Sequence, residues 1–156
     1  MTIPFVKTKI GADPIIVEGY LAASPQSVFR AWTDPRLIVQ WFGPKPNSLL
    51  SAEVDLRIGG AWKFLMKDNG VEKMGFEGKY LTISPSSHLI FSWSKFETGS
   101  KQTRPSLMSQ VEIVLSEMGS GTDIRIVHSA IEDEAMRTGF STGWEHGMKN
   151  LQDFLS

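Results

Sequence analysis

The chain has 156 residues, no cysteine and a formal net charge of −1, from 16 basic and 17 acidic residues. This length predicts one domain over residues 1–156, with 1–14 as an irregular lead-in. The missing cysteine excludes a disulfide framework, a thiol nucleophile and a cysteine metal site. The balanced charge argues against nucleic acid or an anionic membrane as a partner, and no apolar run is long enough for a membrane span or a signal peptide. We therefore expect a cytoplasmic protein.

The first part of the chain predicts a strand followed by two short helices. The segment "IIVEGYLA" over Ile15–Ala22 has the alternation of a strand. Ser24-Pro25 and Asp34-Pro35 each combine a helix-capping side chain with a proline suited to the first helical position. Two tryptophans, Trp32 and Trp41, lie on the apolar sides of these helices. We expect them to hold the helices over one end of the sheet and to help close a cavity.

The middle of the chain predicts six strands joined by short turns, which favours an antiparallel meander. The strand segments are "LLSAEVDLRI", "AWKFLM", "MGFEGKYLTI", "LIFSWSKF", "MSQVEIVLSE" and "TDIRIVHS", with Asn69-Gly70 as a hairpin signal. From about Asp133 a helix is predicted, because the apolar residues Phe140, Trp144, Met148, Leu151 and Leu155 recur at helical spacing. The predicted fold class is α+β, a curved seven-stranded antiparallel sheet covered by one long C-terminal helix.

Five segments in this order also resemble a known family. They are "ASPQSVFRAWTDPRLIVQWFGP", "VDLRIGGAWKF", "GKYLTISPSSHLIFSW", "GTDIRIVHS" and "GWEHGMKNLQDFL". Together they resemble the helix-grip fold of the START-like (SRPBCC) superfamily, and most closely the branch named for the activator of heat-shock protein 90 ATPase, in its single-domain bacterial form. The resemblance implies a sheet that grips the last helix around a cavity. Many relatives bind an apolar or aromatic small molecule there, and some are cyclases or hydrolases. It also implies a chaperone as a partner and a role in the stress response.

Strand alternation places a row of large apolar side chains on the concave face of such a sheet. This composition fits a ligand pocket and an ordinary packed core equally well. The candidate ligand-binding residues are Trp62, Phe64, Met66, Phe91, Trp93, Ile126, His128, Trp144, Gly147 and Met148.

Three glycines recur along the last predicted helix, at positions 139, 143 and 147. Each glycine inside a helix costs about 0.5–1 kcal/mol relative to alanine. Either a close approach to the sheet or space kept for a ligand would compensate for this cost. The sequence leaves both readings open.

The polar candidates are few. His128 ends an inward-facing row, either as a hydrogen-bonding or acid–base group in the cavity or as a structural histidine. His88 in a turn and His146 on a polar helix face are expected to be solvated, and the histidine spacing predicts no metal site. The sequence does not settle whether Glu77 and Lys79 face the cavity.

Three functions follow, all without a cofactor. The first is binding of a small apolar or aromatic ligand. The second is a protein-interaction module, with Phe42, Pro44, Pro46 and the segment 94–106 as its surface. The third is a cyclase- or hydrolase-type enzyme that would need convergent polar groups, for which only His128 and Glu77 are candidates. The sequence favours a binding protein over an enzyme, and it leaves a homodimer open.

Overall fold

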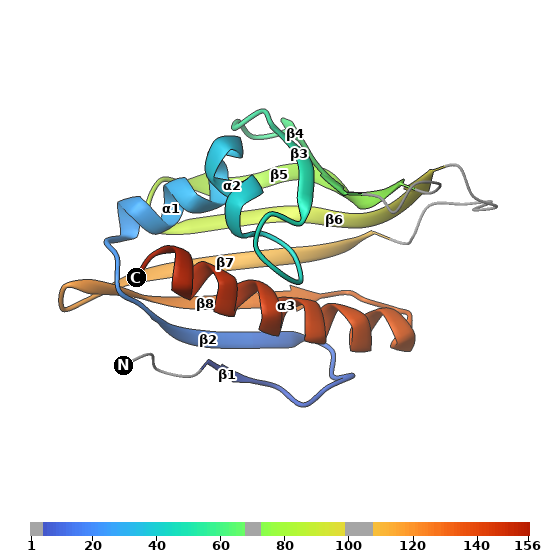
Figure 1. The fold of residues 1–156 in the computed structure, drawn as a ribbon. Helices are drawn as coiled ribbons and strands as arrows, with labels where there is room; N and C mark the ends of the chain where they lie inside the picture. The colour runs from blue at the N-terminus through green and yellow to red at the C-terminus, as the bar shows by residue number, and fades with distance from the viewer. Residues whose placement is uncertain (1–4, 68–72, 99–107) are drawn as a thin grey trace.

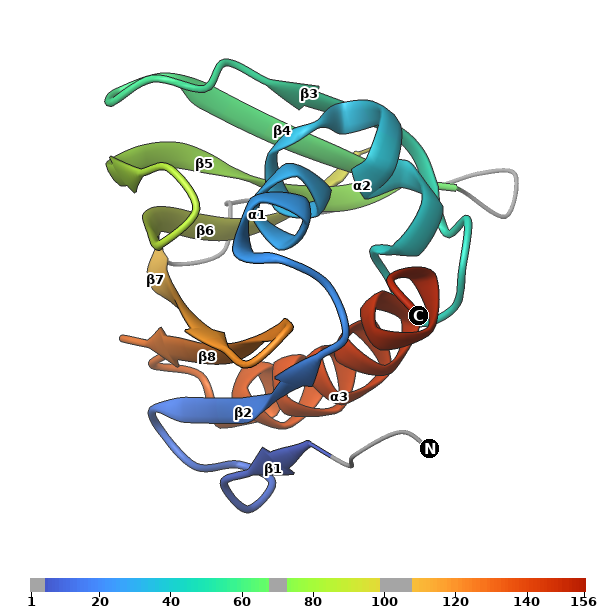
Figure 2. The same ribbon diagram turned by 90° about the vertical axis from the view of Figure 1, so that its left-hand side faces the viewer.

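The computed structural model describes residues 5–67, 73–98 and 108–156, which form one curved antiparallel sheet and three helices (Figure 1). In Figure 2 the sheet bends into an arc, with α2 beside β3 and α3 alongside β2. The strand order is β1-β2-β8-β7-β6-β5-β4-β3. The strands are β1 (Val6–Lys7), β2 (Ile15–Leu21), β3 (Leu49–Val54), β4 (Ala61–Met66), β5 (Lys73–Ser84), β6 (His88–Thr98), β7 (Ser109–Met118) and β8 (Gly121–Ser129). The helices are α1 (Pro25–Thr33), α2 (Pro35–Trp41) and α3 (Glu134–Phe154).

The helix starts follow the capping signals in the sequence. The Ser24 hydroxyl accepts a hydrogen bond from the Ser27 backbone N–H at the start of α1, and an Asp34 carboxylate oxygen accepts one from the Arg36 N–H at the start of α2. These bonds satisfy backbone donors that have no partner inside the helix. The Asp34-Pro35 pair therefore divides the segment into two helices rather than one.

The two tryptophans of these helices contact each other and the backbone at the corner between the helices. The Trp41 indole N–H donates to the Ala31 carbonyl at 2.8 Å, and the rings of Trp32 and Trp41 pack edge to face with centroids 4.9 Å apart. Both side chains are buried. The corner is thus fixed by a hydrogen bond and an aromatic contact together.

The sheet has eight strands among the described residues, so the prediction of seven is wrong. The additional strand is β1 from the expected irregular lead-in, where Val6 pairs opposite Glu18 and Lys7 opposite Val17. It covers the edge of β2, which would otherwise present unpaired backbone groups. The Phe5 ring packs over Gly19, where a Cβ would come within 2.1 Å of the ring. Two paired residues are too few to show strand alternation in a sequence. The hairpin signal Asn69-Gly70 lies outside the described residues.

The predicted phase of the concave face is confirmed. The inward residues of the central strands are buried, and Val111, Ile126 and His128 have no exposed surface. Glu77 and Lys79, whose direction the sequence left open, are exposed. Successive side chains of a strand point to opposite faces of the sheet, and here one face is covered while the other is open to solvent. This accounts for both observations.

Gly78 on β5 gives a test of how closely the strands approach one another. A Cβ on this residue would lie 1.9 Å from the carbonyl oxygen of Ser92, a backbone atom that cannot move aside cheaply. Gly78→Ala is expected to lower the free energy of unfolding by about 1–3 kcal/mol or more. Chemical denaturation measures this change. The exposed neighbour variant Glu77→Ala should change stability by no more than about 0.5 kcal/mol, and an equal loss in both variants would contradict the strand packing described here.

Candidate functional site

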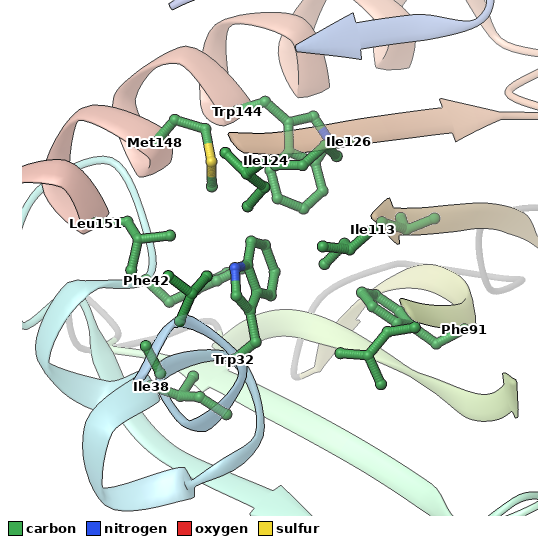
Figure 3. Close-up of a cluster of buried hydrophobic side chains, with 14 of the residues drawn as sticks. Trp32, Ile38, Phe42, Phe91, Ile113, Ile124, Ile126, Trp144, Met148 and Leu151 are labelled. Carbon is green, nitrogen blue, oxygen red and sulfur yellow. The ribbon is translucent and has the colours of Figure 1, made fainter. Parts of the chain in front are cut away.

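The space between the curved sheet, the two short helices and α3 is packed with side chains. Figure 3 shows side chains from both short helices, the sheet and α3 meeting in one cluster, with the Trp32 and Trp144 rings 5.9 Å apart. Six of the predicted ligand-binding residues are buried but do not line the cavity described below. They are Trp62, Phe64, Phe91, Ile126, His128 and Met148. Close packing of large apolar side chains gives these six a place in the core.

An apolar cavity of about 390 Å3 lies beside this core, between α3, the α2–β3 connection and strands β4–β6. Its volume is in the range of small-molecule sites. Aromatic rings and glycines form most of its lining, and among the residues that the structure describes the lining contains no Asp, Glu, Lys or Arg. The lining consists of Trp41, Phe42, Gly43, Pro44, Met66, Met74, Phe76, Trp93, Gly139, Phe140, Thr142, Gly143, Trp144, His146 and Gly147.

The three glycines of α3 all line this cavity. They are spaced by four residues, so they follow one side of the helix. A Cβ built on Gly139, Gly143 or Gly147 meets no atom within 4 Å. A close approach to the sheet therefore does not explain them. Open space does, because each glycine leaves room in the cavity that a larger side chain would occupy.

Four of the ten predicted ligand-binding residues line the cavity, namely Met66, Trp93, Trp144 and Gly147.

The prediction missed the contribution of the α2–β3 connection. Phe42, expected on an interaction surface, is buried, and its ring lies 4.9 Å from that of Phe64. Pro44 and Pro46 are exposed, and residues 99–106 of the proposed surface lie outside the described part. No local pattern shows that this connection meets α3. The contact is long-range and includes a hydrogen bond from the Asn150 amide to the Gly43 carbonyl at 2.9 Å.

His128 is fully hydrogen-bonded behind the cavity wall. The Trp144 indole N–H donates to its Nδ1 at 3.0 Å, so Nδ1 is unprotonated and Nε2 carries the hydrogen. Nε2 then donates to the Ser109 hydroxyl at 2.7 Å, which donates to the Trp93 carbonyl. The Phe140 ring stacks on the imidazole with centroids 5.1 Å apart. Among the predicted roles of His128, this arrangement fits the structural one.

Burial lowers the pKa of His128 to about 3, and so the imidazole is neutral near pH 7. Protonation would also place an N–H on Nδ1, opposite the N–H of Trp144. The other proposed catalytic group, Glu77, is exposed and does not join it. The structure therefore does not assemble the His128–Glu77 pair that acid–base chemistry would use.

The remaining histidines occupy different settings. His88, predicted in a turn and solvated, begins β6 and is half-buried, with its Nε2 2.7 Å from a carboxylate oxygen of Glu112. Pairing across neighbouring strands explains this difference. His146 is exposed as predicted, but it also borders the cavity. Within residues 5–67, 73–98 and 108–156, no group of three or more His, Cys, Asp or Glu side chains is placed to hold a metal ion.

The neutral state of His128 predicts a pH dependence of stability. Its pKa falls from an ordinary value of 6.5 to about 3 in the folded protein. Below pH 6.5 the unfolded chain gains a proton that the folded chain does not, so stability is full above this pH and is lost on acidification towards pH 3. The expected slope from this one group is about 1.4 kcal/mol per pH unit.

The measurement is denaturant unfolding between pH 4 and 7 for the native protein and for His128→Asn. The variant keeps an acceptor for the Trp144 N–H but has no group to titrate, so its stability should depend less steeply on pH. Parallel slopes for the two proteins would contradict a neutral buried histidine. His146→Asn, at the exposed position, serves as the matched control and should keep the native slope.

The fold and cavity define an α+β domain in which one curved antiparallel sheet and a C-terminal helix border an apolar pocket. A family model described as "Activator of Hsp90 ATPase homolog 1-like protein" matches residues 22–156. The chain belongs to this family, which confirms the resemblance found in the sequence. None of the helices in the described residues is both long and apolar enough to cross a membrane.

Solved structures of bacterial proteins share the fold. A protein of Nitrosomonas europaea is 28% identical with a TM-score of 0.73, and the match covers 92% of this chain and 94% of that one. A protein of Chromobacterium violaceum is 26% identical with a TM-score of 0.72, covering 92% and 98%. CalU16 of Micromonospora echinospora is 28% identical with a TM-score of 0.65, covering 97% and 83%. No curated protein matches the chain.

Proposed function

We propose that this protein binds a small, uncharged, apolar or aromatic molecule in the cavity beside α3. The observation that carries the proposal is the set of three α3 glycines that line the cavity with open space at each Cβ position. A helix that only needed to pack would gain stability from larger residues at these positions. Space for a ligand would compensate for the stability that the glycines cost the helix.

The lining determines which ligands fit. Six aromatic side chains supply flat apolar surface, namely Trp41, Phe42, Phe76, Trp93, Phe140 and Trp144. A charged molecule would lose hydration there without gaining a charged partner. An aromatic ligand that buries ~150–250 Å2 would gain several kcal/mol at about 25 cal/mol per Å2, before the costs of association. Binding in this cavity requires no catalytic group.

Regulation of a chaperone ATPase is the second candidate, and the family description supports it. Such a module would act through an exposed surface. Phe42, which the sequence offered for it, is instead part of the core. A cyclase- or hydrolase-type reaction, a homodimer and a cytoplasmic location stay predictions. The ligand proposal has the advantage of a defined site.

Filling the cavity from the helix tests the proposal. Gly143→Leu and Gly147→Leu place a side chain where a Cβ meets nothing. We expect both variants to lose at least tenfold in affinity for the neutral aromatic probe N-phenyl-1-naphthylamine, measured by fluorescence titration. Both should unfold at an equal or higher temperature, because leucine favours a helix over glycine by up to about 1 kcal/mol.

Lys149→Leu is the matched control, because Lys149 is an exposed residue of the same helix that does not line the cavity. It should bind the probe with native affinity. Native affinity in the two glycine variants, with their fold intact by circular dichroism, would overturn the proposed site.

The natural ligand is sought by comparing native and denaturing mass spectra of the freshly purified protein. A small mass that is present only in the native spectrum, and is missing from Gly147→Leu, would support an occupied cavity. The same additional mass on both proteins would show that the molecule lies elsewhere.

A further inference from the structure

A second cavity, of about 430 Å3, lies further towards the start of α3. Four residues border both cavities, namely Met74, Phe76, Gly139 and Phe140. The two spaces are therefore neighbours that share one wall. From Asp133 at one end to Gly147 at the other, they follow α3 for roughly 21 Å at 1.5 Å per residue.

The four shared residues lie between the two cavities and form this wall. It contains the rings of Phe76 on β5 and Phe140 on α3, which pack edge to face with centroids 6.2 Å apart. Phe76 is stacked on Trp93 at 4.6 Å, and Phe140 lies against His128. Both phenylalanines are only partly buried, and Gly139 beside them is exposed. A long molecule lying over these two rings can reach both cavities and keep apolar contact along its length.

The two cavities differ in charge. Among the described residues, the first has no Asp, Glu, Lys or Arg in its lining, whereas Lys95 and Asp133 border the second. Lys95 lies 3.7 Å from Glu97, and Asp133 accepts a hydrogen bond from the Met136 N–H as the cap of α3. An anion in this cavity would lie near the Asp133 carboxylate, and a cation would lie near the Lys95 ammonium group. A hydroxyl group suits both neighbours, because it can donate to a carboxylate and accept from an ammonium group.

We propose that the two cavities form one binding groove for an elongated amphiphile. Its apolar body lies in the first cavity, and its uncharged hydroxyl end crosses Phe76 and Phe140 to reach Lys95 and Asp133. This inference rests on the proposed function, since it assigns a ligand class to the same site and extends that site along α3.

A series of primary alcohols from 1-hexanol to 1-dodecanol tests the length of the groove. Affinity is measured by displacement of N-phenyl-1-naphthylamine from the native protein and from Ala135→Phe. Ala135 is exposed and borders only the second cavity. In the native protein, affinity should rise by up to about fourfold per methylene across the series. In Ala135→Phe it should stop rising at an intermediate length, while the shortest alcohols bind as in the native protein.

The outcomes separate the two proposals. The same length dependence in the native protein and Ala135→Phe would overturn the extended groove while leaving the first cavity in place. Tighter binding of dodecanoate or dodecylammonium than of 1-dodecanol would overturn the hydroxyl assignment. Failure of the native protein to bind the probe and every alcohol would overturn the proposed function itself. Gly143→Leu, titrated with the alcohols by calorimetry, should lose affinity at every length, since it fills the first cavity.

Discussion

The docking of Trp144 against the sheet is the contact on which the rest of the structure depends. Its ring lies 5.4 Å from Trp93 on β6 and 5.9 Å from Trp32 on α1, and its N–H bonds to His128 on β8. One side chain thus joins α3 to both halves of the curved sheet and to α1. A buried indole N–H usually has a hydrogen-bond partner, and the neutral His128 is the partner of Trp144.

This anchoring separates the core from the cavity along a single helix. Trp144, Met148 and Leu151 fill the space inside the grip. The glycines follow a neighbouring line on the helix surface and leave the cavity beside them. Large side chains lie along one line of α3 and glycines along the next. The packed core and the open cavity are therefore neighbours. Filling the cavity should leave the anchoring contacts in place.

The electrostatics of the site follow from the same arrangement. Burial keeps His128 neutral, and in the described part of the chain the cavity in front of it has no Asp, Glu, Lys or Arg in its lining. Charged residues border the second cavity, namely Asp133 at the start of α3 and Lys95 on β6. A molecule with an apolar body and a polar end matches these two cavities. Its body makes apolar contacts in the first cavity, and its polar end keeps hydrogen-bond partners in the second.

The sequence by itself determined the helices, their caps, seven of the strands and the direction of the concave residues, because these depend on local periodicity and capping. It also identified the glycine stripe of α3. The tertiary structure decided which buried residues border open space. Trp62 and Trp93 have the same pattern in the sequence, yet only Trp93 lines the cavity. The reason is that this difference depends on the distant Phe42–Pro44 segment and on the Phe140 ring, whose positions relative to the sheet are set by long-range packing.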